Sequence, residues 1–291
     1  YYAQYGKKNP FNNELSNTEL DAIQARELVS IIHQLCSFPH KVLYYGPAPI
    51  ANIQSALVQY HPLPSIFTSI PPVEKFTFQT QTKNEVLFAE YDMVQADIQW
   101  FRNGEEYNPE RTPVVNMFNE YFGGNMSGIV FQEIRESKAL AYSTFASYGT
   151  PKKKQEPYYM IAYVGCQADK MKEAVQGMQE LLTTLPKSEK LFTNSKESIR
   201  NTISTTRTTK TGILFSYLNA QRKGINYDMN EKIYTSTDNL QFKDIATFYE
   251  QNISKKPYTL TVVGNDKKVN WEELNKFGSV KKLSLEEIFG Y

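Results

Sequence analysis

Hydrophobic positions follow two different periods along the chain, and the change of period predicts its elements. Apolar runs or alternation predict strands at 76–79, 86–88, 98–101, 141–148, 158–164 and 260–263. Spacings of three and four predict helices at 112–122, 127–138, 171–185, 191–203, 213–218 and 242–249, with a last one begun by Asn270 and Glu273. Because strands and helices cluster separately, we predict an α+β fold, with a mainly antiparallel sheet and helices packed on one face.

Residues 1–61 have a pattern of their own. Ser16 and Glu19 form the S-x-x-E signature of a capping box, and helical apolar stripes follow at 28–35 and 50–57. Residues 42–45 read as a buried strand between these stripes. Such a short unit buries too little surface to be stable alone, so we expect it to pack against the rest of the chain.

A proline-rich stretch separates this unit from the remainder of the chain. Four prolines lie within residues 61–72, which excludes continuous helix or central strand there. We therefore divide the chain into residues 1–61, a linker at 62–72, and a main domain at 73–291. The main domain contains the best-marked helix, which Thr112-Pro113 begins and Gly123-Gly124 ends.

Charge and composition exclude several classes of protein. The chain has 32 basic and 31 acidic residues, a net charge of +1, which disfavours a nucleic-acid-binding function. Residues 42–73 have no charged residue, but six prolines and several polar residues exclude a membrane-spanning helix there. Cys36 and Cys166 are too far apart for a C-x-x-C motif, so neither a thiolate zinc site nor a disulfide framework is predicted.

The sequence also lacks the common catalytic motifs. No H-E-x-x-H or H-x-x-E-H string surrounds His33, His40 or His61, and no P-loop or G-x-S-x-G string occurs. His33, Cys36 and His40 could supply three metal ligands, but nothing supplies a fourth. By its motifs alone, the chain contains no metal site and no catalytic machinery.

One segment nevertheless carries a specific signature. Residues 118–136 read FNEYFGGNMSGIVFQEIRE, and Leu140-Ala141-Tyr142 come shortly after. This helix, glycine loop, helix and strand resembles the insulinase (pitrilysin) family of zinc metallopeptidases. The resemblance implies that residues 73–291 are an insulinase-like domain, and that residues 1–61 are the C-terminal part of a preceding domain of the same kind.

Members of that family place an H-x-x-E-H zinc site in one half and close a peptide-holding chamber with a metal-free half. Because this chain lacks the zinc motif, the resemblance implies the metal-free, substrate-binding half. In the family, an Arg on the helix end and a Tyr seven positions later on the strand reach the substrate, which implies these roles for Arg135 and Tyr142. A guanidinium offers rigid donors to peptide carbonyls, and a phenol can donate to an oxyanion.

The implied parent is a zinc endopeptidase that hydrolyses peptides, with its zinc-binding half on the same polypeptide or on a partner subunit. This chain alone is expected to be inactive. The alternative is a structural or interaction module of the same fold, like the core subunits of the respiratory cytochrome bc complex; an unrelated ligand-binding domain is a third interpretation. In those interpretations Arg135 pairs with Glu136 at the surface and Tyr142 is an ordinary strand aromatic. The bacterial periplasm is the expected compartment.

Overall fold

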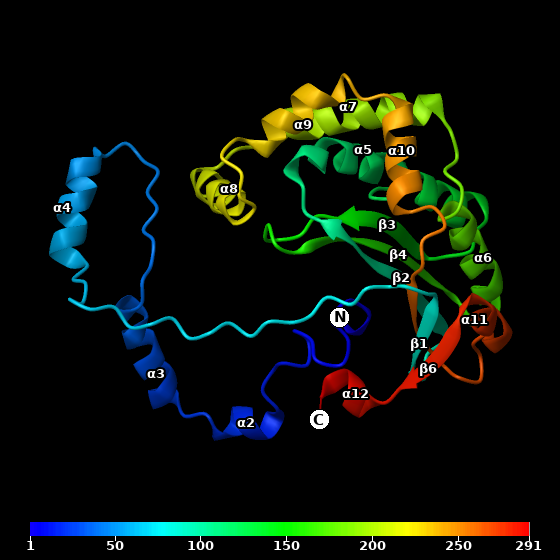
Figure 1. Ribbon diagram of the computed structural model, residues 1–291, viewed down its shortest axis with the longest axis horizontal. Helices are drawn as coiled ribbons and strands as arrows, with labels where there is room; N and C mark the ends of the chain where they lie inside the picture. The colour runs from blue at the N-terminus through cyan, green and yellow to red at the C-terminus, as the bar shows by residue number, and fades with distance from the viewer. Residues whose placement is uncertain (291) are drawn as a thin grey trace.

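A six-stranded mixed sheet forms the centre of the computed structural model, which describes residues 1–290 (Figure 1). The strands lie in the order β3-β4-β2-β5-β1-β6. Pairs β3/β4, β4/β2 and β2/β5 are antiparallel, whereas β5/β1 and β1/β6 are parallel. The predicted α+β class with a mainly antiparallel sheet is confirmed. The strand bounds are β1 (Glu85–Glu90), β2 (Gln95–Glu106), β3 (Ser143–Gly149), β4 (Pro157–Gln167), β5 (Thr259–Gly264) and β6 (Ser279–Leu283).

Helices cover one face of this sheet: Figure 1 shows α5 next to the strands, with α7 and α9 packed on the outer side of α5. Alternate strand residues such as Ile98, Trp100 and Val164 point to that face and are fully buried in the main hydrophobic core. The helices of the main domain are α5 (Thr112–Phe122), α6 (Met171–Leu181), α7 (Glu189–Thr205), α8 (Lys210–Arg222), α9 (Met229–Thr237), α10 (Phe242–Asn252), α11 (Trp271–Phe277) and α12 (Leu285–Phe289). Short 3₁₀ segments occur at Leu35–Ser37, Pro109–Arg111 and Ala168–Lys170, and a π-helix at Phe131–Ser137.

The opposite face of the sheet is largely open. Its aromatic residues stack in two pairs, Phe101 with Tyr159 and Phe145 with Tyr163, with ring centroids 5.9 and 5.4 Å apart. One end of this face is covered by α1 (Tyr2–Tyr5), whose Ala3 is buried against Phe101 in a small second core. On the rest of the face Phe145 is exposed, and the Tyr163 hydroxyl donates to the Asp97 carboxylate at 2.7 Å.

The first residues of the chain are tied to the main domain by hydrogen bonds. Backbone N–H of Gln79 donates to Gln4 O at 2.8 Å, and the side chain of Gln81 donates to Ala3 O at 3.0 Å. The Asn103 side chain donates to Gln4 O at 3.0 Å as well. For this segment, the expected packing of residues 1–61 against the main domain is correct.

Residues 13–71, called the arm below, do not share that packing. Helices α2 (Asn17–Ala22), α3 (Ala25–Gln34) and α4 (Ile50–Tyr60) contain no buried residue, and Figure 1 shows them apart from the sheet. The capping box from Ser16 to Glu19 is confirmed. The strand at 42–45 and its burial are wrong, because no described strand pairs with that segment. The packing expected of residues 1–61 is therefore wrong for the arm helices.

Other details also differ from the predicted pattern. Residues 76–79 are extended but belong to no strand, since Gln79 pairs with α1 instead. The helix expected at 127–138 is mostly the π-helix Phe131–Ser137. The elements α1, α9, β6 and α12 were not predicted. No helix within residues 1–290 has the length and hydropathy that crossing a bilayer requires.

Candidate functional site

The glycine-loop signature forms a connection from α5 to β3, and Asn119 fixes it in place. The Asn119 side chain donates to Tyr148 O at 3.0 Å and accepts from Tyr148 N at 2.7 Å. This paired contact occupies backbone groups at the free edge of β3, as a neighbouring strand would. Helix α5 is thereby locked to the edge strand that the signature leads into.

Gly123 allows the helix end to approach β3 closely. A Cβ at this position would lie 2.8 Å from Ala146 N, and Gly123 O accepts a hydrogen bond from that N–H at 3.1 Å. The backbone at Gly128 also lies close to Gly123: a Cβ atom at position 128 would be 3.1 Å from Gly123 Cα. The glycines of the signature therefore have a packing role, which agrees with the sequence-based interpretation.

Arg135 lies in the π-helix that follows this loop. Ile134 next to it is fully buried, so the helix is anchored to the core on one side. The Arg135 guanidinium lies 4.8 Å from the centroid of the Phe131 ring and 3.8 Å from a Glu136 carboxylate oxygen. Its side chain is 44% exposed, so the ion pair is weak and a ligand can compete for the guanidinium.

Tyr142 lies just before β3, seven residues after Arg135. Its backbone N–H donates to Gly165 O at 2.9 Å, which holds the residue against β4. The phenol is 58% exposed and its oxygen accepts from the Gln167 side chain at 3.2 Å. Because that contact uses the oxygen as an acceptor, the hydroxyl proton is available to another group.

The buried ionisable groups near this connection stay neutral at physiological pH. Burial raises the pKa of Tyr148 to about 12 and that of Tyr158 to about 12, so both phenols are neutral at physiological pH. Burial also raises the pKa of the Cys166 thiol to about 12, which removes it as a nucleophile. The polar groups of Arg135 and Tyr142, by contrast, are exposed on the connection.

The described residues provide no zinc site. No group of three or more His, Cys, Asp or Glu side chains in residues 1–290 is arranged to hold a metal. His40 instead contacts His61, with their Nε2 atoms 2.7 Å apart. The sequence reasoning missed this pair and the Asn119 contact, because neither has a local sequence signal.

Comparisons with known proteins place these features in a family. The family model described as "Peptidase M16 inactive domain" matches residues 53–198, half of the chain. An uncharacterized zinc protease of Bacillus subtilis (strain 168), YmxG, is 29% identical over 134 residues, which are 45% of this chain and 31% of that protein. This chain thus spans about a third of that relative's length.

Solved structures share the fold. A peptidase M16 inactive domain from Pseudomonas fluorescens has a TM-score of 0.67 and 13% identity, covering 97% of this chain and 65% of that one. The ferredoxin protease FusC, solved in complex with Arabidopsis ferredoxin, has a TM-score of 0.64 and 15% identity, covering 91% of this chain and 29% of that one. Since the family model covers half of its residues, the chain belongs to the peptidase M16 (insulinase) family, as an inactive domain.

Proposed function

We propose that this chain is the substrate-binding, chamber-closing half of a zinc-dependent endopeptidase, with the zinc site outside the chain. Two features, taken together, support the proposal. The chain has no arranged metal ligands in its described residues, and it presents Arg135 and Tyr142 exposed on one short connection between the core and the edge of the sheet.

The roles proposed for the two residues follow from their chemistry. The Arg135 guanidinium carries five N–H donors in a fixed plane, which suits the carbonyl groups of an extended peptide. Tyr142 can donate one hydrogen bond to the oxyanion that forms when a peptide carbonyl is attacked. Neither side chain can activate a water molecule without a metal or base, so the chain alone is inactive in this proposal.

We propose that the zinc-binding half packs against the arm. The exposed apolar face of α3, formed by Leu28, Ile31 and Ile32 and continued by Leu35 just after the helix, has no partner among the described residues. The chain spans about a third of its zinc-protease relative, so the remainder of such a protein is available to cover this face. We propose that residues 1–61 complete a preceding domain, as the division at the 62–72 linker implies.

A protein or peptide substrate fits the open face of the sheet. FusC is named a ferredoxin protease and was solved with a ferredoxin, which supports a polypeptide as the class of ligand for this fold. The alternative is a non-enzymatic interaction module of the same fold. It differs from the main proposal in predicting that Arg135 and Tyr142 are dispensable in any parent enzyme.

Zinc analysis and a peptide-cleavage assay test whether zinc binding and hydrolysis require a half outside this chain. Purified residues 1–291 should hold no stoichiometric zinc and cleave no fluorogenic peptide, because a zinc site needs three or four arranged ligands. The same chain joined to a zinc-binding half should hold one zinc and cleave the peptide. Zinc-dependent cleavage by the isolated chain would contradict the proposal.

A further inference from the structure

The open face of the sheet carries a carboxylate close to the connection that contains Arg135 and Tyr142. Asp97 lies on β2 and pairs with Gly165 of β4, whose other neighbour is Ser143 of β3. Tyr142 is bound to the same glycine, because its backbone N–H donates to Gly165 O at 2.9 Å. Asp97 is therefore two strand spacings, about 10 Å, from the end of β3 where Tyr142 lies.

Three side-chain oxygen atoms converge above Gly165, which has no side chain of its own. A Cβ atom at this position would lie 2.7 Å from the Tyr163 hydroxyl, 3.1 Å from Ser143 Oγ and 3.4 Å from Asp97 Oδ1. The Tyr163 hydroxyl donates to Asp97 Oδ1 at 2.7 Å, which holds the carboxylate in this place. Burial and the hydrogen bond to Asp97 raise the pKa of Tyr163, so the phenol remains a neutral donor at physiological pH.

No cation of residues 1–290 neutralises this carboxylate. None of the ion pairs in that part of the chain involves Asp97. Lys281, at the far edge of the same face, is already paired with Glu287 at 2.8 Å. The open-face positions around Asp97 carry no charge: Gln95, Gln99, Ser143, Tyr163, Gln167 and Val263. A carboxylate with one phenol partner has acceptor capacity left for a ligand.

An exposed aromatic ring lies beside the carboxylate. Phe145 stacks on Tyr163 with their ring centroids 5.4 Å apart, and it is 40% exposed. Ammonium and guanidinium groups form charge-assisted hydrogen bonds with carboxylates, and they are also attracted to the faces of aromatic rings. The aliphatic stems of lysine and arginine pack on apolar surface in the same way. The combination of Asp97 and Phe145 therefore suits a basic side chain.

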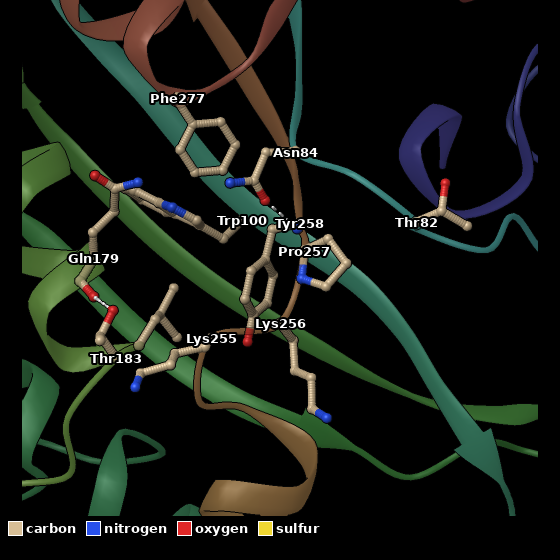
Figure 2. Close-up of a pocket in the computed structure, with 11 residues that line it drawn as sticks. Thr82, Asn84, Trp100, Gln179, Thr183, Lys255, Lys256, Pro257, Tyr258 and Phe277 are labelled. Carbon is tan, nitrogen blue, oxygen red and sulfur yellow. Dashed lines mark hydrogen bonds between the residues drawn. The ribbon is translucent and has the colours of Figure 1, made fainter.

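The cavity on the helical side of the sheet is arranged differently. It has a volume of about 350 Å³ and is lined by residues of β2, of α6 and of the loop before β5 (Figure 2). Its two lysines, Lys255 and Lys256, point to different sides in Figure 2, and the indole nitrogen of Trp100 is buried. The charged groups of the cavity thus do not converge on one point, whereas the oxygen atoms above Gly165 do.

From these contacts we propose that Asp97 binds a lysine or arginine side chain of a polypeptide on the open face, and thereby selects substrates with a basic residue near the scissile bond. The statement about substrates rests on the proposed function, in which Tyr142 lies at the reacting carbonyl. An extended chain advances about 3.3 Å per residue, so about 10 Å corresponds to about three residues. The basic residue is therefore expected within about three or four residues of the bond that is cleaved.

Peptide binding to residues 1–291 tests the inference without any cleavage. The probes are two labelled nonapeptides of alanine, serine and valine that differ only in a central lysine or glutamine. In fluorescence anisotropy, the lysine peptide should bind about three- to tenfold more tightly, and added salt should reduce this difference. Asp97→Asn keeps an acceptor for Tyr163 but removes the charge, so both peptides should then bind equally. Glu250→Gln, at an exposed position of α10, is the matched control and should preserve the difference.

Cleavage by an enzyme that contains both halves separates this inference from the proposed function. With the lysine placed in turn at the three or four positions on either side of the scissile bond, one position should raise kcat/KM about three- to tenfold over glutamine. Asp97→Asn should abolish that gain, with folding checked by thermal melting. Tyr142→Phe should lower cleavage of the lysine and glutamine peptides alike and leave their ratio unchanged.

Two sets of results would overturn different claims. If residues 1–291 bind neither peptide, bind both equally, or keep their preference for lysine in Asp97→Asn, the inference about Asp97 is wrong, whatever the kinetics of Tyr142→Phe. If Tyr142→Phe and Arg135→Ala leave cleavage unchanged while Asp97→Asn abolishes the preference for lysine, the proposed function fails and the basic-residue site remains.

Discussion

At the scale of single residues, Asn119 has the clearest structural role at the candidate site. Replacing it with alanine removes both hydrogen bonds to Tyr148 and leaves a part-buried backbone N–H and C=O without their protein partner. We expect Asn119→Ala to lower the free energy of unfolding by about 2 kcal/mol in urea denaturation. Asn201→Ala, an exposed helical control, should change it by less than about 0.5 kcal/mol. Equal effects of the two substitutions would show that the contact is unimportant.

The buried tyrosines give stability a specific pH dependence. The folded-state pKa of Tyr148 and Tyr158 is about 12, above the ordinary value of 10, because burial favours the neutral phenol. The stabilising contribution is therefore complete below about pH 10 and is lost as the pH rises toward 12. Urea denaturation should show the free energy of unfolding falling between about pH 10 and 12. The decline should be shallower in Tyr158→Phe, and a decline of equal slope would contradict this assignment.

At the scale of elements, the sequence predicted the ends of those helices that are set by local interactions. The Thr112-Pro113 start and the Gly123-Gly124 stop gave the bounds of α5, and the Ser16 capping box gave the start of α2. Elements that depend on distant partners were harder to predict. β6 is short and half exposed, and it exists because it pairs with β1. The apolar segment at 42–45 looks like a strand but has no described neighbour to pair with.

The candidate site was predictable only in part. The spacing of Arg135 and Tyr142 and the family signature around them are visible in the sequence. The π-helix that contains Arg135, and the Gln167 contact that leaves the Tyr142 proton available, depend on tertiary packing. The cavity at Trp100 assembles segments from residues 82 to 277, so no local pattern could indicate it.

The arm and α1 should respond differently to proteases. Arm helices without buried residues open easily, whereas α1 is held by Gln79, Gln81 and Asn103. Limited proteolysis should therefore cut first within residues 13–71. The N-terminal fragment should remain bound to the main domain in native gel filtration. First cuts in α5 or α6, or release of that fragment, would contradict this description.

At the scale of the whole molecule, the apolar face of α3 is expected to be an interface. Ile32 is 61% exposed, so Ile32→Ser should scarcely change the stability of residues 1–291. In an enzyme that includes the zinc-binding half, the same substitution should lower stability by about 1 to 3 kcal/mol, because the residue is then buried. Val94→Ser, on an exposed turn of the sheet, is the control and should be neutral in both. Identical effects in the short and long proteins would argue against the interface.

The central claim is that Arg135 and Tyr142 act on a substrate whose hydrolysis occurs at a zinc site elsewhere. The most direct measurement is the steady-state kinetics of peptide cleavage by an enzyme that contains both halves. Tyr142→Phe should lower kcat by about 10² to 10³, the range for loss of one oxyanion donor, and Arg135→Ala should also weaken substrate retention. Tyr217→Phe on α8 is the matched control and should leave kcat unchanged.

Zinc content and melting temperature should stay the same in all three variants, because none of these side chains holds metal or fills the core. That combination of lower kcat/KM with unchanged zinc and folding is the result the account predicts. If Tyr142→Phe and Arg135→Ala both keep the parental kcat/KM on an unstructured peptide, the two residues take no part in hydrolysis, the central claim is wrong, and the result favours a structural role for this chain.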